Sequence, residues 1–355
     1  MLPEDWHTLA LWTIGVLIVC TLLLSVYVSY AILYPPFCNA QSGAELSKKT
    51  VSKAWGDTHT NPLHDFGIEY EDVEFDSVCG NTLRGWFIDR RQSRKSEGAA
   101  ELRNRNKAAS PKDDVAVVFV HGGGRDRRAF LRHTPLVCER GGFSALLYDA
   151  RGHGASDLDH VGLSMGLREH EDVMEAVKYM TSTRGFKKVV LIGTSVGAYS
   201  SILATTKLPA ELVAGVIAEN PFTNIRDNVN GIVLNLACRR VVCRCGERFV
   251  QCAWPLRKLM EQAVWLLVGR ALGKEAHMSS HDALQVIERI KQPILFMHGD
   301  NDHLIHHDHS HALYEAASEP KDVWIAPDAD HCALINIHPD EYERRVLGFL
   351  QKCVA

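Results

Sequence analysis

The stretch VVLIGTSVGAYSSILA, residues 189–204, decides the fold of this 355-residue chain. Val189–Ile192 is a β-branched and aliphatic run that predicts a buried strand, and the residues from 198 to 206 predict a helix. Between them lies Gly193-Thr194-Ser195-Val196-Gly197. A Gly-x-Ser-x-Gly sequence between strand and helix is typical of a strained turn that presents a nucleophilic serine, with glycines where a Cβ would collide. We therefore expect Ser195 to be catalytic and Gly193 and Gly197 to form its turn; an ordinary Gly–Ser turn is the alternative.

Similar apolar runs recur on both sides of this stretch and alternate with amphipathic segments. Strands are expected at 115–120, 144–148, 189–192, 213–218, 294–297 and 323–325, with helices at 127–140, 167–182, 196–207, 306–317 and 340–353. Uninterrupted apolar strands separated by helices predict an α/β fold, with a mostly parallel sheet covered by helices on both faces. Two earlier strands, 68–78 and 82–88, predict an antiparallel start.

Two segments interrupt the alternation. Residues 90–112 are basic and poor in apolar side chains, which predicts an exposed loop. From about 222 to 290 the strands stop and a long helical run takes their place, which predicts a helical cap insertion over one end of the sheet.

A serine on such a turn requires an acid and then a histidine, in that chain order. The strand at 294–297 runs into a segment with two carboxylates, Asp300 and Asp302. The last strand leads to His331, the only histidine there before the C-terminal helix apart from His338. We expect His331 to take the Ser195 proton while a carboxylate orients the imidazolium. A surface loop rich in Asp and His is the alternative for the acid site.

Stabilising the resulting oxyanion requires two converging backbone donors. One is the N–H of Val196, the residue after the nucleophile, and the other is expected from the loop His121-Gly122-Gly123-Gly124 after the strand 115–120. The sequence contains neither G-x-G-x-x-G nor G-x-x-x-x-G-K-[ST], so the glycine run does not favour nucleotide binding.

At this point the chain resembles the α/β-hydrolase superfamily. The matching segments are VVFVHGGGRDRR (117–128), LLYDARGHGASD (146–157), VVLIGTSVGAYSSILA (189–204), ENPF (219–222), PILFMHGDNDHLI (293–305) and PDADHCALI (327–335). The chain is most similar to the branch of prolyl-oligopeptidase-type and serine-aminopeptidase-type hydrolases and related abhydrolases.

The resemblance implies the α/β-hydrolase fold and a serine hydrolase without metal or cofactor. It selects Asp302 over Asp300 as the acid and assigns the second oxyanion donor to the region of Gly122 and Gly123. The sequence departs from the family's usual Gly-x-Gly-His, because Asp330 directly precedes His331. We expect this carboxylate to raise the pKa of His331.

The N-terminal part of the chain predicts a membrane anchor. Residues 9–33 carry no charge, and about 20 apolar residues are enough to cross a bilayer as a helix. The predicted order is a tail (1–8), a transmembrane helix (9–33), a linker (34–66) and the hydrolase domain (67–355). A signal peptide cleaved near Ser29-Tyr30-Ala31 is the alternative.

The charges near the predicted helix indicate its orientation. No Lys or Arg precedes it, whereas Lys48, Lys49 and Lys53 follow it. The positive-inside rule therefore places the catalytic domain in the cytoplasm. The absence of an Asn-x-Ser/Thr sequon, and ten cysteines without the spacing of a disulfide framework, agree with a reducing compartment.

Composition excludes several classes of protein. With 46% hydrophobic and 23% charged residues the chain is not disordered, and a net charge of −4 argues against a nucleic-acid partner. The histidine-rich segment 303–311 lacks His-Glu-x-x-His spacing, so we expect a polar helix start and no metal site.

Three functions are compatible with these observations. The first is a membrane-anchored serine hydrolase that forms an acyl-enzyme, acting on an ester or thioester of a lipid or acylated molecule. The second is a serine peptidase of the prolyl-oligopeptidase or aminopeptidase type, which an acidic pair for a substrate α-amine would favour. The third is a catalytically silent scaffold, which an intact set of Ser195, Asp302 and His331 disfavours.

Overall fold

A single eight-stranded sheet forms the centre of the computed structural model, which describes residues 4–34, 60–91, 111–159, 161–234, 254–278 and 281–354. Its order is β1-β2-β4-β3-β5-β6-β7-β8. β2 pairs antiparallel with β1 and β4, and the other neighbours are parallel, which confirms the predicted mostly parallel sheet. The strands are β1 (Glu71–Asp76), β2 (Thr82–Ile88), β3 (Val115–Val120), β4 (Ser144–Asp149), β5 (Lys188–Thr194), β6 (Val213–Glu219), β7 (Ile294–Gly299) and β8 (Lys321–Ala326).

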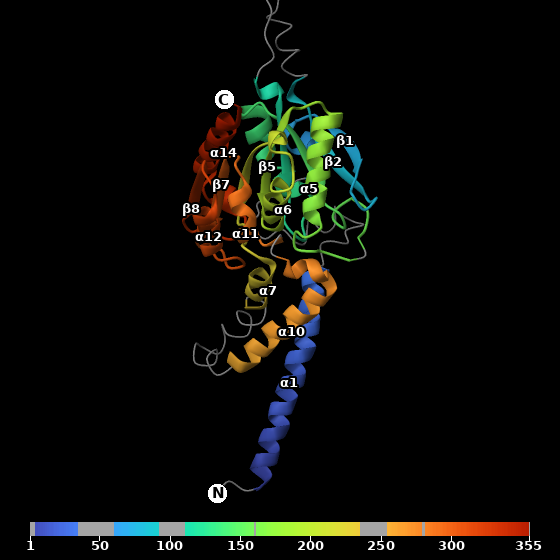
Figure 1. Ribbon diagram of the computed structural model, residues 1–355, viewed down its shortest axis with the longest axis vertical. Helices are drawn as coiled ribbons and strands as arrows, with labels where there is room; N and C mark the ends of the chain where they lie inside the picture. The colour runs from blue at the N-terminus through green and yellow to red at the C-terminus, as the bar shows by residue number, and fades with distance from the viewer. Residues whose placement is uncertain are drawn as a thin grey trace, which may run out of the picture.

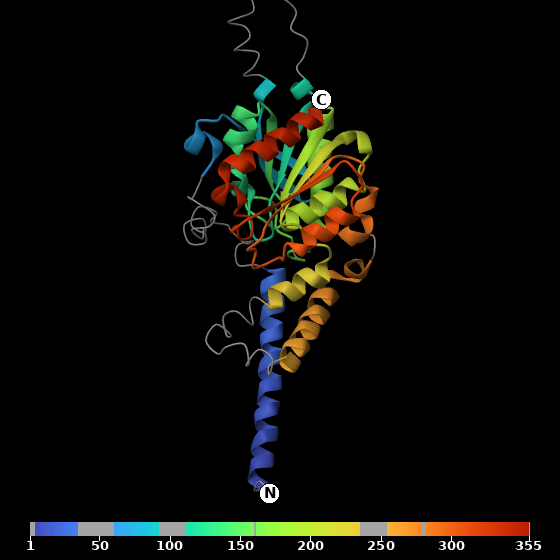
Figure 2. The same ribbon diagram turned by 90° about the vertical axis from the view of Figure 1, so that its left-hand side faces the viewer.

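Helices cover both faces of this sheet (Figures 1 and 2). They are α3 (Pro62–Phe66), α5 (Glu169–Lys178), α6 (Val196–Thr205), α11 (Ala283–Val286), α12 (Asp308–Ala316), α13 (Leu334–Ile337) and α14 (Pro339–Val354). Side chains of β3 alternate between two apolar clusters, one shared with α5, α6 and α12 and the other with α14. Because both faces are buried, the strand is apolar at every position.

Two predicted elements differ from the observed ones. The helix expected over 127–140 is divided into two short helical segments, Arg127–Phe130 and Pro135–Arg140. Pro135 has no N–H, so it cannot donate the hydrogen bond to the carbonyl of Leu131 that a continuous α-helix would contain. The strand expected over 68–78 is shorter, because only residues 71–76 pair with β2.

The parallel strands bring the predicted site residues to one edge of the sheet. The glycine loop follows β3, Ser195 follows β5, Asp302 follows β7 and His331 follows β8. In open α/β sheets this carboxyl edge is where ligands bind.

A long helix, α1 (Glu4–Leu33), projects from the domain, and its C-terminal part packs against α10 (Trp254–Leu272) (Figures 1 and 2). Its residues His7–Leu33 are long and apolar enough to cross a membrane, by length and composition. α10 also packs against α7 (Ile225–Leu234), and both helices belong to the predicted cap insertion. Outside the described residues lie 235–253 and 279–280 of the cap, 35–59 of the predicted linker and 92–110 of the predicted basic loop.

The turn between β5 and α6 passes very close to β3. A Cβ placed on Gly197 would lie 2.0 Å from the carbonyl oxygen of Val120, and one on Gly193 would lie 2.4 Å from that of Gly197. Both contacts are with backbone, which cannot move aside as a side chain can. The glycines that flank Ser195 are therefore required by the packing of the turn.

We predict that Gly197→Ala lowers the free energy of unfolding by about 3 kcal/mol, because the added methyl group collides with β3. Gly348→Ala, within α14, is the matched control: nothing lies within 4 Å of its Cβ position, and alanine is the better helix former by about 1 kcal/mol. Denaturant unfolding of the purified proteins measures both. Equal stability of the two variants would show that β3 does not restrict the turn.

Candidate active site

Ser195 occupies a strained backbone conformation at the start of α6. Its φ of 54° and ψ of −120° are rare for a residue with a side chain. The strained turn is fixed at both ends, because the Ser195 N–H donates to the carbonyl oxygen of Glu219 (2.8 Å) and its carbonyl accepts from the N–H of Tyr199 (3.0 Å). Val196 begins the helix, so its N–H belongs to the first turn, where amides have no carbonyl partner within the helix.

The acid and the histidine expected from the sequence are hydrogen-bonded to each other. His331 Nδ1 lies 2.7 Å from Asp302 Oδ2. The other carboxylate oxygen of Asp302 accepts from the backbone N–H groups of Leu304 (2.8 Å) and Ile305 (2.9 Å). Asp302 is buried whereas Asp300 is exposed, so the structure brings Asp302 and not Asp300 to the histidine.

Two further polar side chains support this pair. Asn220, which follows β6, donates from Nδ2 to Asp302 Oδ2 (2.6 Å) and accepts the backbone N–H of Cys332 (3.2 Å). His298, at the end of β7, has its Nε2 3.2 Å from Asp302 Oδ2. Sequence reasoning assigned neither residue a role, although both lie in the matched segments at strand ends. Their position at the end of a strand is the only feature of the sequence that indicates a role for them.

The proximity of opposite charges shifts the pKa of both partners. Burial alone would raise the pKa of Asp302, but the charge of His331 and hydrogen bonds from His298 and His331 hold it well below its usual range. Burial alone would lower the pKa of His331, but Cys332 and Asp302 raise it well above the ordinary imidazole value. Since burial raises the pKa of the Cys332 thiol, that group is neutral at neutral pH, and Asp302 supplies the charge.

Asp330 makes backbone hydrogen bonds beside the histidine. Cys332 and Asp302 are the neighbours that raise the pKa of His331. The Oδ1 of Asp330 instead accepts the backbone N–H groups of His331 (2.7 Å) and His303 (3.2 Å). Asp330 therefore fixes the loop that carries the histidine.

The glycine loop after β3 lies directly against the nucleophile turn. A Cβ on Gly122 would lie 3.2 Å from the Ser195 Cβ, and one on Gly123 would lie 3.1 Å from Val196 Cγ2. The loop is held by His121, whose Nδ1 lies 2.9 Å from the carbonyl oxygen of Gly122 and whose Nε2 accepts the N–H of Ala150 (3.0 Å).

The protonation of His121 agrees with these bonds. Burial lowers its pKa to about 3, so the ring is neutral and carries its proton on Nδ1. In a trans peptide the C=O and the following N–H point in opposite directions. Because His121 binds the carbonyl of Gly122, the N–H of Gly123 points away from His121.

A second buried carboxyl group lies beside the site. Glu219 ends β6 and lines a small pocket together with Thr194 and Cys332, the neighbours of Ser195 and His331. Its carboxylate accepts from the Tyr342 hydroxyl (3.0 Å), and burial raises the pKa of Glu219 to about 7. This pocket connects the loop of the serine with the loop of the histidine.

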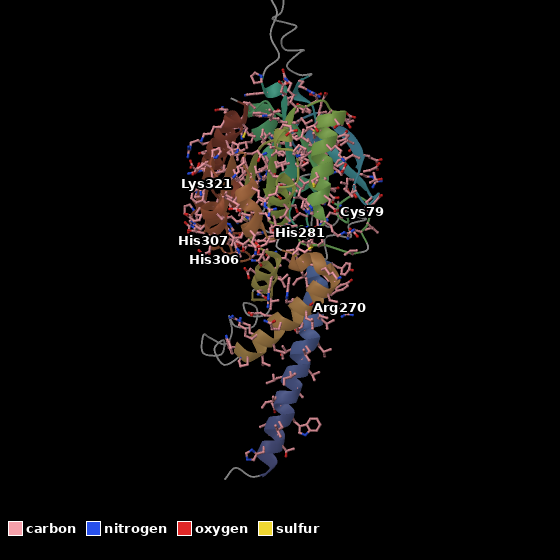
Figure 3. All side chains as sticks on the ribbon, in the orientation of Figure 1. Cys79, Arg270, His281, His306, His307 and Lys321 are labelled. Atoms are coloured by element: carbon pink, nitrogen blue, oxygen red, sulfur yellow. The ribbon has the colours of Figure 1, made fainter. Side chains whose placement is uncertain are left out.

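Among the described residues, one group of side chains has the chemistry to hold a metal ion. Ligand atoms of His306, His307 and Asp308 lie within 4.8 Å of one another. The group lies at the beginning of α12 on the surface of the domain (Figure 3). The hydrogen bonds given above for Ser195, Asp302 and His331 do not involve these three side chains.

Comparison with known proteins identifies the family of the chain. The model of the Alpha/beta hydrolase family matches residues 117–345. The chain is 24% identical to the uncharacterized protein YfhR of Escherichia coli strain K12 over 286 residues, which cover 79% of this chain and 80% of YfhR. It is also 24% identical to the uncharacterized protein YqkD of Bacillus subtilis strain 168, covering 66% of this chain and 70% of YqkD.

Solved structures share the fold. The Pyrococcus furiosus esterase Pf2001 superposes with a TM-score of 0.59 at 21% identity, covering 84% of this chain and 98% of the esterase. The hydrolase GrgF from Penicillium sp. sh18 gives a TM-score of 0.55 at 20% identity, with 81% and 99% covered. The α/β-hydrolase fold expected from the resemblance is confirmed, and the chain belongs to the alpha/beta hydrolase family.

Proposed function

We propose that this protein is a membrane-anchored serine hydrolase that uses Ser195, Asp302 and His331 and forms an acyl-enzyme. The observation that carries the proposal is the strained Ser195 on its strand–helix turn, at the same edge of the sheet as a histidine that a buried carboxylate holds at 2.7 Å. Backbone strain of this kind persists only where the surrounding structure enforces it, and it is concentrated at functional sites.

In the proposed reaction, His331 takes the hydroxyl proton of Ser195 as the oxygen attacks a substrate carbonyl carbon. The Asp302 carboxylate stabilises the imidazolium that forms. The N–H of Val196 and the backbone of Gly122 and Gly123 stabilise the oxyanion. His331 then gives its proton to the leaving group, and water attacks the acyl-enzyme by the same route to release the acid.

The position of α1 supports an ester or thioester of a lipid or acylated molecule as substrate. The carbonyl oxygen of Leu33, at the end of α1, accepts the N–H of Leu163 (2.7 Å). The Leu163 side chain in turn covers Gly123, where a Cβ would lie 2.7 Å from its Cδ2. One residue thus separates the anchor from the glycine loop. The structurally similar protein Pf2001 is an esterase, which agrees with ester chemistry.

Burial along α1 supports an uncleaved anchor over a signal peptide. Ser25, Val28 and Ser29 are almost fully buried in the structure. Cleavage near Ala31 would remove all three and uncover the surface of the cap against which α1 packs. We place the catalytic domain on the cytoplasmic side, because basic residues follow the helix and none precedes it.

We predict that a fluorophosphonate probe labels the wild-type protein and that Ser195→Ala abolishes labelling, because the probe reacts only with an activated serine. Ser201→Ala, which removes a buried serine of the same helix, is the matched control and should keep its labelling. Labelling that requires permeabilised cells would place the domain inside the cell. A folded wild type that is not labelled in either preparation would favour the scaffold function.

A second prediction concerns pH. His331 must be neutral to accept a proton, so kcat/KM should rise with pH through the raised pKa of His331, with a midpoint above 6.5. Asp302→Asn removes the stabilising charge and should lower kcat by about 10³–10⁴-fold and move the midpoint to lower pH. Asp300→Asn is the control for an exposed carboxylate of the same loop and should change neither quantity. A loss of kcat in Asp300→Asn with no loss in Asp302→Asn would identify Asp300 as the acid.

A further inference from the structure

The cap helix α10 exposes three large apolar side chains, which lie on different sides of the helix. Leu266 is 70% exposed, Trp254 is 55% exposed and Leu267 is 37% exposed. Met260, Val264 and Val268 form the buried side of the helix, and Leu266 lies opposite to them. Large apolar side chains exposed to this extent on one helix are found where a surface binds another protein or a membrane.

α1 indicates which of these partners lies at α10. Along residues 7–24, α1 has almost no contact with the rest of the protein, and this length is about 27 Å at 1.5 Å per residue. That nearly equals the roughly 30 Å hydrocarbon core of a bilayer. From Ser25 onward one side of α1 is buried, and this is the part that packs against α10. A bilayer that fills the uncovered length of α1 therefore ends at the level of α10 (Figures 1 and 2).

The chemistry of α10 fits the region between headgroups and acyl chains. Trp265 and Leu266 line a groove of about 570 Å³, together with Arg270 and Lys274 toward its other end. Arg270 lies close to the level where α1 meets the domain (Figure 3). Tyr27 and Tyr30 of α1, both exposed, lie just beyond its uncovered segment. Aromatic and basic side chains beside an apolar face are characteristic of helices that bind anionic membrane surfaces.

We infer that α10 is a second membrane-binding element, whose Leu266 side enters the same leaflet as α1, with Arg270 and Lys274 at anionic headgroups. The inference rests on the proposed membrane anchoring and adds to it. The bilayer surface then lies beside the cap, and an acylated substrate reaches Ser195 directly from the leaflet.

Photolabelling of the full-length protein tests this inference. The protein is reconstituted in vesicles of phosphatidylcholine and phosphatidylserine that contain a phospholipid with a diazirine near the glycerol end of its acyl chain. After irradiation, trypsin separates three informative peptides, 1–48 with α1, 259–270 with most of α10, and 54–84 with the exposed Leu63. We expect label on the first two and not on the third.

Two matched substitutions sharpen the test. Leu266→Glu should lower the labelling of peptide 259–270 about fivefold and leave that of 1–48 unchanged, because a carboxylate disfavours insertion. Leu63→Glu makes the same change at another exposed leucine and should alter neither, and circular dichroism shows that both variants are folded. Label on 1–48 alone overturns the inference and leaves the anchor intact. Absence of label from 1–48 overturns the anchor and the inference together.

Discussion

The buried carboxylate of Asp302 is the group on which the arrangement of the site depends. It accepts hydrogen bonds from His331 and Asn220 and from the backbone of Leu304 and Ile305. These donors belong to the loops after β6, β7 and β8, so one negative charge fixes three loops that are far apart in sequence. An uncompensated charge in this position would cost several kcal/mol, which makes the geometry of all three loops interdependent.

The strain at Ser195 is balanced by the packing of the sheet beneath it. Holding a residue with a side chain at positive φ costs on the order of 1–3 kcal/mol. The strands β3, β5 and β6, buried throughout except at Lys188, supply the rigid support, and Gly193 and Gly197 allow the turn to approach β3. The neutral His121 fixes the glycine loop without adding a positive charge to it. Serine and glycine loop are thus positioned before any substrate binds.

The sequence alone was sufficient for much of the fold, for a physical reason. A strand buried on both faces is apolar at every position, so β3 begins and ends where predicted. Asn220 and His298 were not predictable as partners of Asp302, because a hydrogen bond between loops leaves no periodic pattern in the chain. The contact between α1 and α10 was not predictable either, since a continuous apolar run has the same sequence pattern whether it faces lipid or protein. The structure, however, distinguishes the two by burial.

The hydrogen bond between Leu33 and Leu163 joins the end of α1 to the loop that covers Gly123. Gly162, at a φ of 76°, has no room for a Cβ because the carbonyl of Leu33 would lie 2.4 Å from it. The loop that covers Gly123 is thus shaped around the end of α1. Deletion of the first 34 residues would remove the carbonyl of Leu33, and the loop that covers Gly123 would lose this support.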